Sequence, residues 1–320
     1  MFAIIEPALR RYRRKVFHRT DGRSTLFAGI CAFAVLAWPQ ASRAAFTIQF
    51  DYTYDTSGFF SGANLGRRAL LDDAASVFEN DLTTGNLGAI TPGGGNTWSL
   101  SFPNPSTGVN VTLNNPVVAP NAITIYVGAR DLPGVLIGSS SYQYSFFGNS
   151  SWVNLFQTRD SQTSFGSFGG AIAFDSLTPW YFDTDPLTLE SFPGDYDFYS
   201  VAEHEIGHLL GFTDGANAFN AHVSGTQFVG SHVEALFGGP APLAGASDLD
   251  HWQQGLVSGG QEVLMDPTFF FNQRKTPTPL DLAAFQDIGY TLITVPEPTT
   301  ASLVALAVVA FVVMSRRRVH

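Results

Sequence analysis

The segment His204–Asp214 constrains the fold of this chain more than any other, because it holds two histidines one helical turn apart. His204 and His208 belong to a His-Glu-x-x-His motif, and residues i and i+4 lie on the same face of an α-helix. Two imidazoles on one face supply half of a zinc site, and Glu205 lies beside them where it can act on water. Gly211 tolerates the left-handed conformation that ends helices. The motif therefore predicts a helix that binds a metal.

The residues around this motif favour a helix that is buried against a sheet. Asp195 and Asp197 lie just before it, where acidic side chains stabilise a helix N-terminus. The apolar content is that of a buried helix; the residues are Tyr199, Val201, Ala202, Ile206, Leu209 and Leu210. We therefore expect the helix to extend from about residue 198 to residue 212.

Periodicity along the rest of the chain predicts both strands and helices. Short apolar runs predict strands over 45–53, 122–129, 170–174 and 180–182, and a hairpin over 97–102 and 109–113. Helical spacing predicts helices over 69–80 and 280–287, the second begun by Pro279. The Gly/Ser/Phe-rich residues 133–168 are expected to be irregular, and residues 213–250 to be an inserted loop. The expected fold class is α+β, with a twisted mixed sheet over the helix of the motif and a C-terminal helix.

The N-terminal residues 1–44 have the parts of a secretory signal peptide. Basic residues gather from Arg10 to Lys15, and an apolar run follows from Leu26 to Trp38. This run is short for a membrane span, which favours a cleaved signal. We expect a signal peptidase to cut after Ala44 and the chain to be exported across the inner membrane, which leaves one domain over 45–294.

The C-terminal residues 295–320 combine Val-Pro-Glu-Pro, an apolar run over 301–314 and a basic end formed by Arg316, Arg317 and Arg318. This three-part order resembles the PEP-CTERM sorting signal of Gram-negative bacteria. The resemblance implies a short transmembrane segment that anchors the chain transiently and is removed by an exosortase-type processing enzyme. It also implies a secreted or cell-surface protein.

The charge of the chain without its two ends argues against nucleic acid as a partner. Eight of the 17 basic residues lie in 1–44 and three lie after residue 315, whereas two of the 27 acidic residues lie in 1–44. Six basic residues remain against 25 acidic ones, a net charge near −19. Such a surface repels phosphate backbones and anionic lipids. The single cysteine, Cys31, lies in the signal peptide, so the mature chain has no disulfide to stabilise it.

A catalytic zinc site needs a third protein ligand beside an open position. Asp214 lies six residues after His208, and His251 lies further along in Asp-His-Trp. Three neutral imidazoles leave zinc a stronger Lewis acid than two imidazoles and a carboxylate. His251 also precedes Met265 by 14 residues, so that one loop can carry both under the metal. Asp214 and His251 are therefore competing candidates.

Four segments occur in an order that resembles the leishmanolysin group of metzincin zinc peptidases; they are His204–Phe212, His251-Trp252, Glu262–Pro267 and Pro279–Tyr290. That group interrupts its motif after Gly-Phe. The resemblance implies that His251 is the third ligand and that Met265 lies in a Met-turn, whereas other metzincins place the third ligand at the spacing of Asp214. The chain departs from the group in a shorter insertion, an extra residue within the Glu-Leu-Met string and the lack of cysteines.

These expectations together predict a zinc-dependent metalloendopeptidase that acts on protein or peptide substrates. One zinc ion activates water, Glu205 serves as general base, and strand 170–174 pairs with an extended substrate. The alternative is a non-catalytic, zinc-stabilised surface or exopolysaccharide-matrix protein, which has no use for Glu205. Calcium is a candidate second metal, with solvated loop carboxylates as the alternative; the acids concerned are Asp183, Asp185, Asp195, Asp197, Asp248 and Asp250.

Overall fold

The computed structural model describes residues 46–84, 86–186 and 188–293. The predicted signal peptide over 1–44 and the predicted sorting tail over 295–320 lie outside these residues. None of the helices within the described residues is long and apolar enough to cross a membrane.

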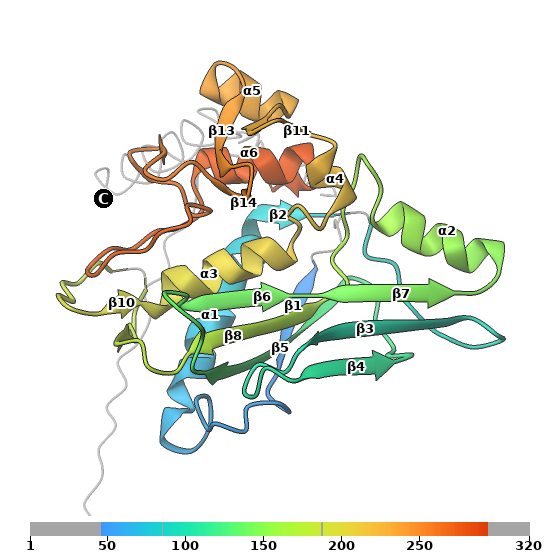
Figure 1. Cartoon of the computed structure of the whole chain (residues 1–320), viewed down its shortest axis with the longest axis horizontal. Coiled ribbons are helices and arrows are strands. Elements are labelled where there is room, and N and C mark those ends of the chain that lie inside the picture. The colour runs from blue at the N-terminus through green and yellow to red at the C-terminus, as the bar shows by residue number, and fades with distance from the viewer. Residues whose placement is uncertain (1–45, 85, 187, 294–320) are drawn as a thin grey trace, which may run out of the picture. The chain divides into compact units, whose positions relative to one another are not determined.

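The central sheet has four strands in the order β1-β5-β8-β6 (Figure 1). Its parallel strands are β1 Thr47–Asp51, β5 Ala122–Arg130 and β8 Gly170–Asp175, and the edge strand β6 Gly138–Ser141 runs antiparallel to β8. β8 is buried along its whole length, as expected where both faces of a sheet are covered. The predicted strands over 45–53, 122–129 and 170–174 are thus confirmed within the described residues.

Helices α1 (Gly66–Asp81) and α3 (Phe198–Leu209) pack against this sheet. α3 contacts β6 and β8, whereas α1 contacts β1 and α3. Apolar residues of both helices and of the sheet form one core, which includes Leu71, Ala74, Phe78, Val201, Ile206, Ile125 and Ile172. The predicted helices over 69–80 and 198–212 are therefore present, although the second ends at Leu209 and continues as a turn.

A second, smaller core lies beneath a three-stranded antiparallel sheet, β4-β3-β7. Its elements are β3 Thr97–Pro103, β4 Asn110–Asn114, β7 Gln143–Phe147 and α2 Ser150–Arg159. The predicted hairpin is confirmed, but the expectation of an irregular segment over 133–168 is wrong. In β7 the side chains of Tyr144 and Phe146 pack on this core while Ser145 faces outward. Residues Gln143–Phe146 alternate polar and aromatic side chains, which is the pattern of a half-buried strand.

The segment 213–250 is structured, so the expectation of an inserted loop is wrong. It contains α4 Asn217–Asn220, β11 Val223–Ser224, β12 Gln227–Phe228, α5 Ser231–Phe237, β13 Ala241–Gly245 and the start of β14 Asp248–Trp252. The strands form an antiparallel sheet in the order β11-β12-β13-β14. Phe219, Phe228 and Trp252 are fully buried and join Phe212 in the main core. A few aromatic anchors therefore order a segment that is otherwise rich in Gly and Ala.

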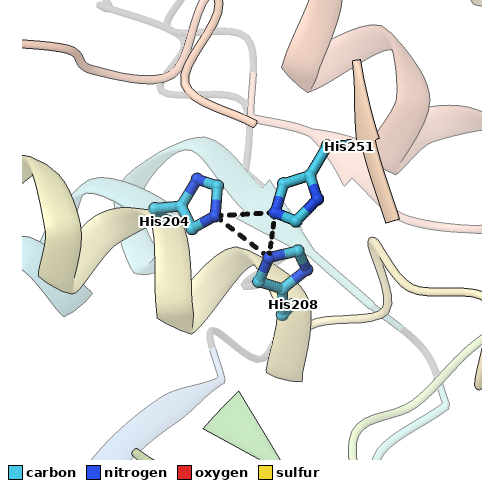
Figure 2. Close-up of side chains that lie close together, drawn as sticks. All are labelled: His204, His208 and His251. Carbon is cyan, nitrogen blue, oxygen red and sulfur yellow. Dashed lines mark hydrogen bonds between the residues drawn. The ribbon is translucent and has the colours of Figure 1, made fainter. Parts of the chain in front are cut away.

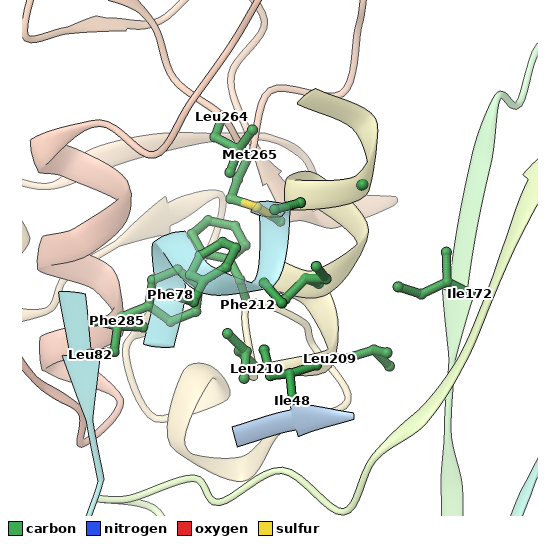
Figure 3. Packing of buried hydrophobic residues seen from close by; sticks show 14 of the residues in the cluster. Ile48, Phe78, Leu82, Ile172, Leu209, Leu210, Phe212, Leu264, Met265 and Phe285 are labelled. Carbon is green, nitrogen blue, oxygen red and sulfur yellow. The ribbon is translucent and has the colours of Figure 1, made fainter. Parts of the chain in front are cut away.

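Helix α6 (Pro279–Asp287) begins with a capping box in which Thr278 and Asp281 satisfy each other's backbone amides. Phe285 of this helix packs edge-on against Phe78 of α1, with ring centroids 5.7 Å apart (Figure 3). The predicted helix over 280–287 is confirmed.

Short elements complete the chain. They are η1 Gly62–Asn64, β2 Leu82–Thr83, β9 Trp180–Tyr181, β10 Tyr196–Asp197, β15 Val257–Ser258, β16 Gln261–Glu262 and β17 Thr291–Leu292. Together the described residues form a mixed α+β structure with open sheets and six α-helices, which is the class that the sequence predicts.

Candidate metal centre

The Nε2 atoms of three histidines face one another (Figure 2). His204 Nε2 lies 3.0 Å from His208 Nε2, and His251 Nε2 lies 3.2 Å from each of them. Helix α3 supplies the first two side chains and strand β14 the third. Among the described residues, these are the only three or more His, Cys, Asp or Glu side chains placed to hold a metal ion together.

The other ring nitrogen of each histidine lies beside an oxygen that only accepts hydrogen bonds. The partners of Nδ1 are the Leu264 carbonyl for His204 (2.9 Å), the Phe212 carbonyl for His208 (2.7 Å) and Asp248 Oδ1 for His251 (2.6 Å). In the neutral form of each ring these acceptors favour the proton on Nδ1, which leaves the electron pair on Nε2. In neutral rings of this tautomer the three Nε2 electron pairs face one another, an arrangement that a cation stabilises.

Burial favours the neutral rings that metal ligation requires. Desolvation, followed by the neighbouring rings of His208 and His251, lowers the pKa of His204 well below its usual value. Desolvation and His251 lower the pKa of His208 to about 3. Both rings of α3 are therefore uncharged at neutral pH and ready to donate an electron pair.

The spacing of the three nitrogens fits zinc. Zn–N bonds of about 2.0–2.1 Å at tetrahedral angles place ligand nitrogens about 3.3–3.4 Å apart. The observed 3.0–3.2 Å is close to this separation. Asp214, the competing candidate, is exposed and lies outside the group; its backbone amide donates to Asp250 Oδ1 at 2.5 Å.

Glu205 lies next to the histidines with its carboxyl group buried at the wall of a cleft. Burial raises the pKa of this carboxyl to about 7, and hydrogen bonds from the side chain and the backbone of Ser140 oppose the rise. A carboxyl group that titrates near neutral pH exchanges protons readily in either direction.

The end of α3 positions His208. Gly211 adopts a φ of 108°, and its amide and that of Phe212 return to the carbonyls of His208 (3.0 Å) and Gly207 (3.2 Å). This is a Schellman motif, as the sequence predicts for a glycine at this place. The turn directs the Phe212 carbonyl back onto His208 Nδ1. The glycine that ends the helix therefore also orients an imidazole.

Met265 is fully buried and lies against α3 (Figure 3). A Cβ on Gly207 would approach Met265 Sδ to 2.7 Å, so the close contact requires glycine in the helix. The buried Asp281 carboxylate accepts hydrogen bonds from the amides of Leu264 (2.9 Å) and Met265 (3.2 Å). This turn presents the Leu264 carbonyl to His204, so α6 supports the group of three histidines through Asp281.

Arg274 ties the segment after this turn to the start of α3. Asp197 caps the helix by accepting from the Ser200 amide at 3.3 Å, and Arg274 Nε donates to Asp197 Oδ2 at 2.8 Å. The same guanidinium binds the buried Asp183 at 2.7 Å. Two of the acids considered for calcium therefore pair with an arginine. Within the described residues the other acids join no second metal cluster.

A cleft of about 520 Å³ opens over the three histidines. Its walls come from residues 135–140, from His204, Glu205 and His208 of α3, and from residues 267–270. A second hollow of similar volume continues past His208 along residues 140–144. Strand β6 and the residues on either side of it border both hollows. Strand β8, expected to pair with substrate, lies between β5 and β6 and has no free edge, so that expectation is wrong.

Several residues of this centre were missed by sequence reasoning. They are Gly138, Ser140, Asp248, Asp281 and Arg274. Asp248 lies three residues before His251 and its spacing was a usable signal, whereas the serine-rich β6 offers none.

Comparison of the chain with family models, with curated proteins and with solved structures finds no match.

Proposed function

We propose that the chain is a zinc-dependent metalloendopeptidase with a metzincin-like fold, and that His204, His208 and His251 are its metal ligands. One observation carries the proposal. Three imidazoles direct their Nε2 atoms at one point, and a buried carboxyl group lies beside them at the wall of a cleft. A structural zinc site does not require the carboxyl group of Glu205, whereas hydrolysis does.

Zinc bound here would polarise a peptide carbonyl and make water a better nucleophile. The carboxylate of Glu205 accepts the proton from the attacking water and transfers it to the nitrogen of the leaving amine. Its pKa of about 7 suits both transfers at neutral pH. Met265 and the Leu264 carbonyl hold α3 and His204 in place during these steps.

Strand β6 is the element proposed to bind the substrate backbone. It is the edge strand of the central sheet, and it borders the cleft on both sides of the histidines. An extended polypeptide that pairs with a free edge gains backbone hydrogen bonds independent of its sequence. Hollows on both sides of the histidines leave room for the substrate polypeptide before and after the cleaved bond, which favours an endopeptidase.

The proposal includes the location expected from the two ends of the chain. A signal peptidase and an exosortase-type enzyme would process the ends, and the acidic domain would act as a secreted or cell-surface enzyme on proteins or peptides. Calcium is less well supported than zinc, because two of the acids considered for it, Asp183 and Asp197, pair with Arg274.

The test combines metal analysis with hydrolysis of unfolded casein by the purified chain. Wild type is expected to bind one zinc ion and to cleave casein, and a chelator is expected to abolish cleavage. Glu205→Ala should keep zinc and lose about 10²–10⁴-fold in activity, the usual contribution of a general base. Glu234→Ala on α5 serves as the control with full activity. A zinc-loaded, folded wild type without hydrolysis would favour the non-catalytic surface or matrix protein.

A further inference from the structure

Lys275 is the only lysine after residue 15 of the chain, and its side chain is only 1% exposed. Lysine is almost never buried to this extent unless its charge is paired. The proposed hydrolysis makes no use of this side chain. A buried ammonium group ten residues after Met265 therefore calls for a role of its own.

Three oxygen atoms surround the ammonium group of Lys275. Nζ donates to the Thr268 carbonyl at 2.6 Å, and it pairs with Glu262 Oε2 at 3.0 Å and with Asp266 Oδ1 at 3.3 Å. An ammonium group has three N–H donors, so each donor has one acceptor here. The Asp266 carboxylate is fully buried and also accepts from the Thr268 amide at 2.8 Å. One cation thus joins the beginning, the middle and the end of the segment 262–275.

Part of this segment is a wall of the cleft. Residues 267–270 line the cleft and belong to neither a helix nor a strand, so side-chain contacts must hold them in place. Phe269 of this wall lies with its ring centroid 5.1 Å from Lys275 Nζ, within the range of a cation–π contact. The same ring meets the imidazole of His204 edge-on, with centroids 5.2 Å apart. Lys275 therefore contacts the wall through both its backbone and an aromatic side chain.

The backbone of Lys275 is fixed to the helix that carries the histidines. Its amide donates to Ser200 Oγ of α3 at 2.8 Å. The preceding residue, Arg274, pairs with Asp197 at the start of the same helix. The end of the segment is thus attached to α3 independently of the ammonium group, and α3 is the reference against which Lys275 places the wall.

We propose that Lys275 is a positioning residue that fixes the cleft wall of residues 267–270 beside the three histidines before substrate binds. The inference rests on the proposed peptidase function for its kinetic consequence, whereas the fixing of the wall does not. A wall that is ordered in advance spares the substrate the entropic cost of ordering it. Without the ammonium group, Asp266 would be a buried carboxylate without a cation and the Thr268 carbonyl would lose its donor, so the wall would have to open to water.

Hydrogen exchange tests the fixing of the wall without any need for activity. Lys275→Met keeps a long, unbranched side chain and removes the charge. In this variant the Thr268 amide should exchange at least about tenfold faster than in wild type, whereas the Ile172 amide in β8 should stay protected. Equal exchange of the Thr268 amide in the two proteins would overturn the inference.

Arg159→Met is the matched control, because it removes another cation that is 1% exposed and lies outside the cleft. Arg159 donates to the carbonyls of Gly88, Gly166 and Ser167. Its loss should leave the exchange of the Thr268 amide as in wild type. Equally faster exchange in Arg159→Met and in Lys275→Met would assign the effect to a general loss of stability and overturn the inference.

Glu262→Gln provides the test if Lys275→Met does not fold. Glu262 is the more exposed of the two carboxylates, and the amide replaces it without leaving a cavity. The variant removes one charge from the ammonium group and should speed exchange of the Thr268 amide about threefold. Wild-type exchange in Glu262→Gln would then overturn the inference.

Kinetics test the consequence for substrate. Lys275→Met is expected to raise KM for a peptide at least about fivefold with kcat within about twofold, because a wall that contacts substrate throughout contributes uniform binding. Arg159→Met should keep the wild-type KM. Zinc content should stay at one ion per chain in Lys275→Met, because α3 and β14 supply the three imidazoles. A wild-type KM, or a loss of zinc, in folded Lys275→Met would overturn the positioning role.

The two proposals fail in different ways. If the wild type hydrolyses no substrate while the Thr268 amide loses protection only in Lys275→Met, the peptidase function is wrong and the fixing of the wall stands. If casein is hydrolysed while the exchange and KM of Lys275→Met equal those of wild type, the peptidase stands and the positioning role is wrong.

Discussion

The sulfur of Met265 fills the space that a side chain at Gly207 would need, since a Cβ built there would lie 2.7 Å from Met265 Sδ. Gly207 is the residue before His208 in α3, and the turn of Met265 carries the carbonyl that binds His204. This contact joins two segments that are almost sixty residues apart in the sequence, and each of them positions a histidine of the group. The geometry of the three imidazoles therefore depends on a glycine that has no chemical role.

Gly207→Ala tests this contact. The added methyl group must displace Met265, and overpacking of this kind costs about 1–3 kcal/mol. The free energy of unfolding in urea should fall by that amount, and zinc affinity should fall with it. Gly66→Ala at the start of α1 is the matched control, because nothing lies within 4 Å of a Cβ there. Equal losses of stability in both variants would show that the contact with Met265 is unimportant.

Single substitutions at His251 and Asp214 test which of the two residues is the third metal ligand. His251→Ala removes one of three converging Nε2 atoms and is expected to lose stoichiometric zinc after dialysis. Asp214→Ala should retain one zinc ion, because Asp214 lies outside the group. Zinc is measured by elemental analysis and by the shift in melting temperature on adding metal, since a ligand at about 100 times its Kd stabilises by about 2.7 kcal/mol. Zinc loss from Asp214→Ala with retention by His251→Ala would reverse the assignment.

The carboxylate of Asp248 fixes the tautomer and orientation of His251 through a 2.6 Å hydrogen bond to Nδ1. Loss of such a supporting carboxylate weakens metal affinity about 10–100-fold. Asp248→Ala is therefore expected to release zinc to a competing chelator at a correspondingly lower chelator concentration. Asp131→Ala, at an exposed residue that does not line the cleft, should behave as wild type. Unchanged affinity in Asp248→Ala would remove Asp248 from the metal centre.

The pair of Arg274 with Asp183 predicts how stability responds to acid. Burial by itself raises the pKa of the Asp183 carboxyl, but the Asp185 amide and the Arg274 guanidinium together hold that pKa below its usual 3.8. At pH values between the lowered pKa and about 3.8, the unfolded chain therefore binds more protons than the folded chain. The contribution of this pair to the free energy of unfolding is therefore complete above about pH 4. It is lost as the pH falls through the lowered pKa.

Urea unfolding at several pH values checks this expectation. Asp183→Asn should be less stable than wild type at pH 7, because it leaves the buried Arg274 without one partner. Between about pH 4 and pH 3 it should lose less stability than wild type, because it has one fewer carboxylate to protonate. Asp131→Asn is the surface control. Parallel pH profiles for wild type and Asp183→Asn would contradict the prediction.

Local spacing was enough to predict the parts of this protein that depend on a single helix. His204 and His208 share a face because they are four residues apart, Gly211 ends the helix because it adopts a positive φ, and Pro279 begins α6. The alternation of apolar residues likewise predicted β1, β5 and the β3–β4 hairpin. These relations need no knowledge of the rest of the chain.

Tertiary packing decided the remainder. Only the burial of Trp252 and Phe228 in the core places β14 so that His251, rather than Asp214, meets the helix. The serine-rich β6 carries no periodic apolar signal, and it is a strand because its backbone pairs with β8. Helix geometry is set by neighbours in sequence, whereas strand pairing and ligand convergence arise between residues tens of positions apart, whose meeting depends on how the whole core packs.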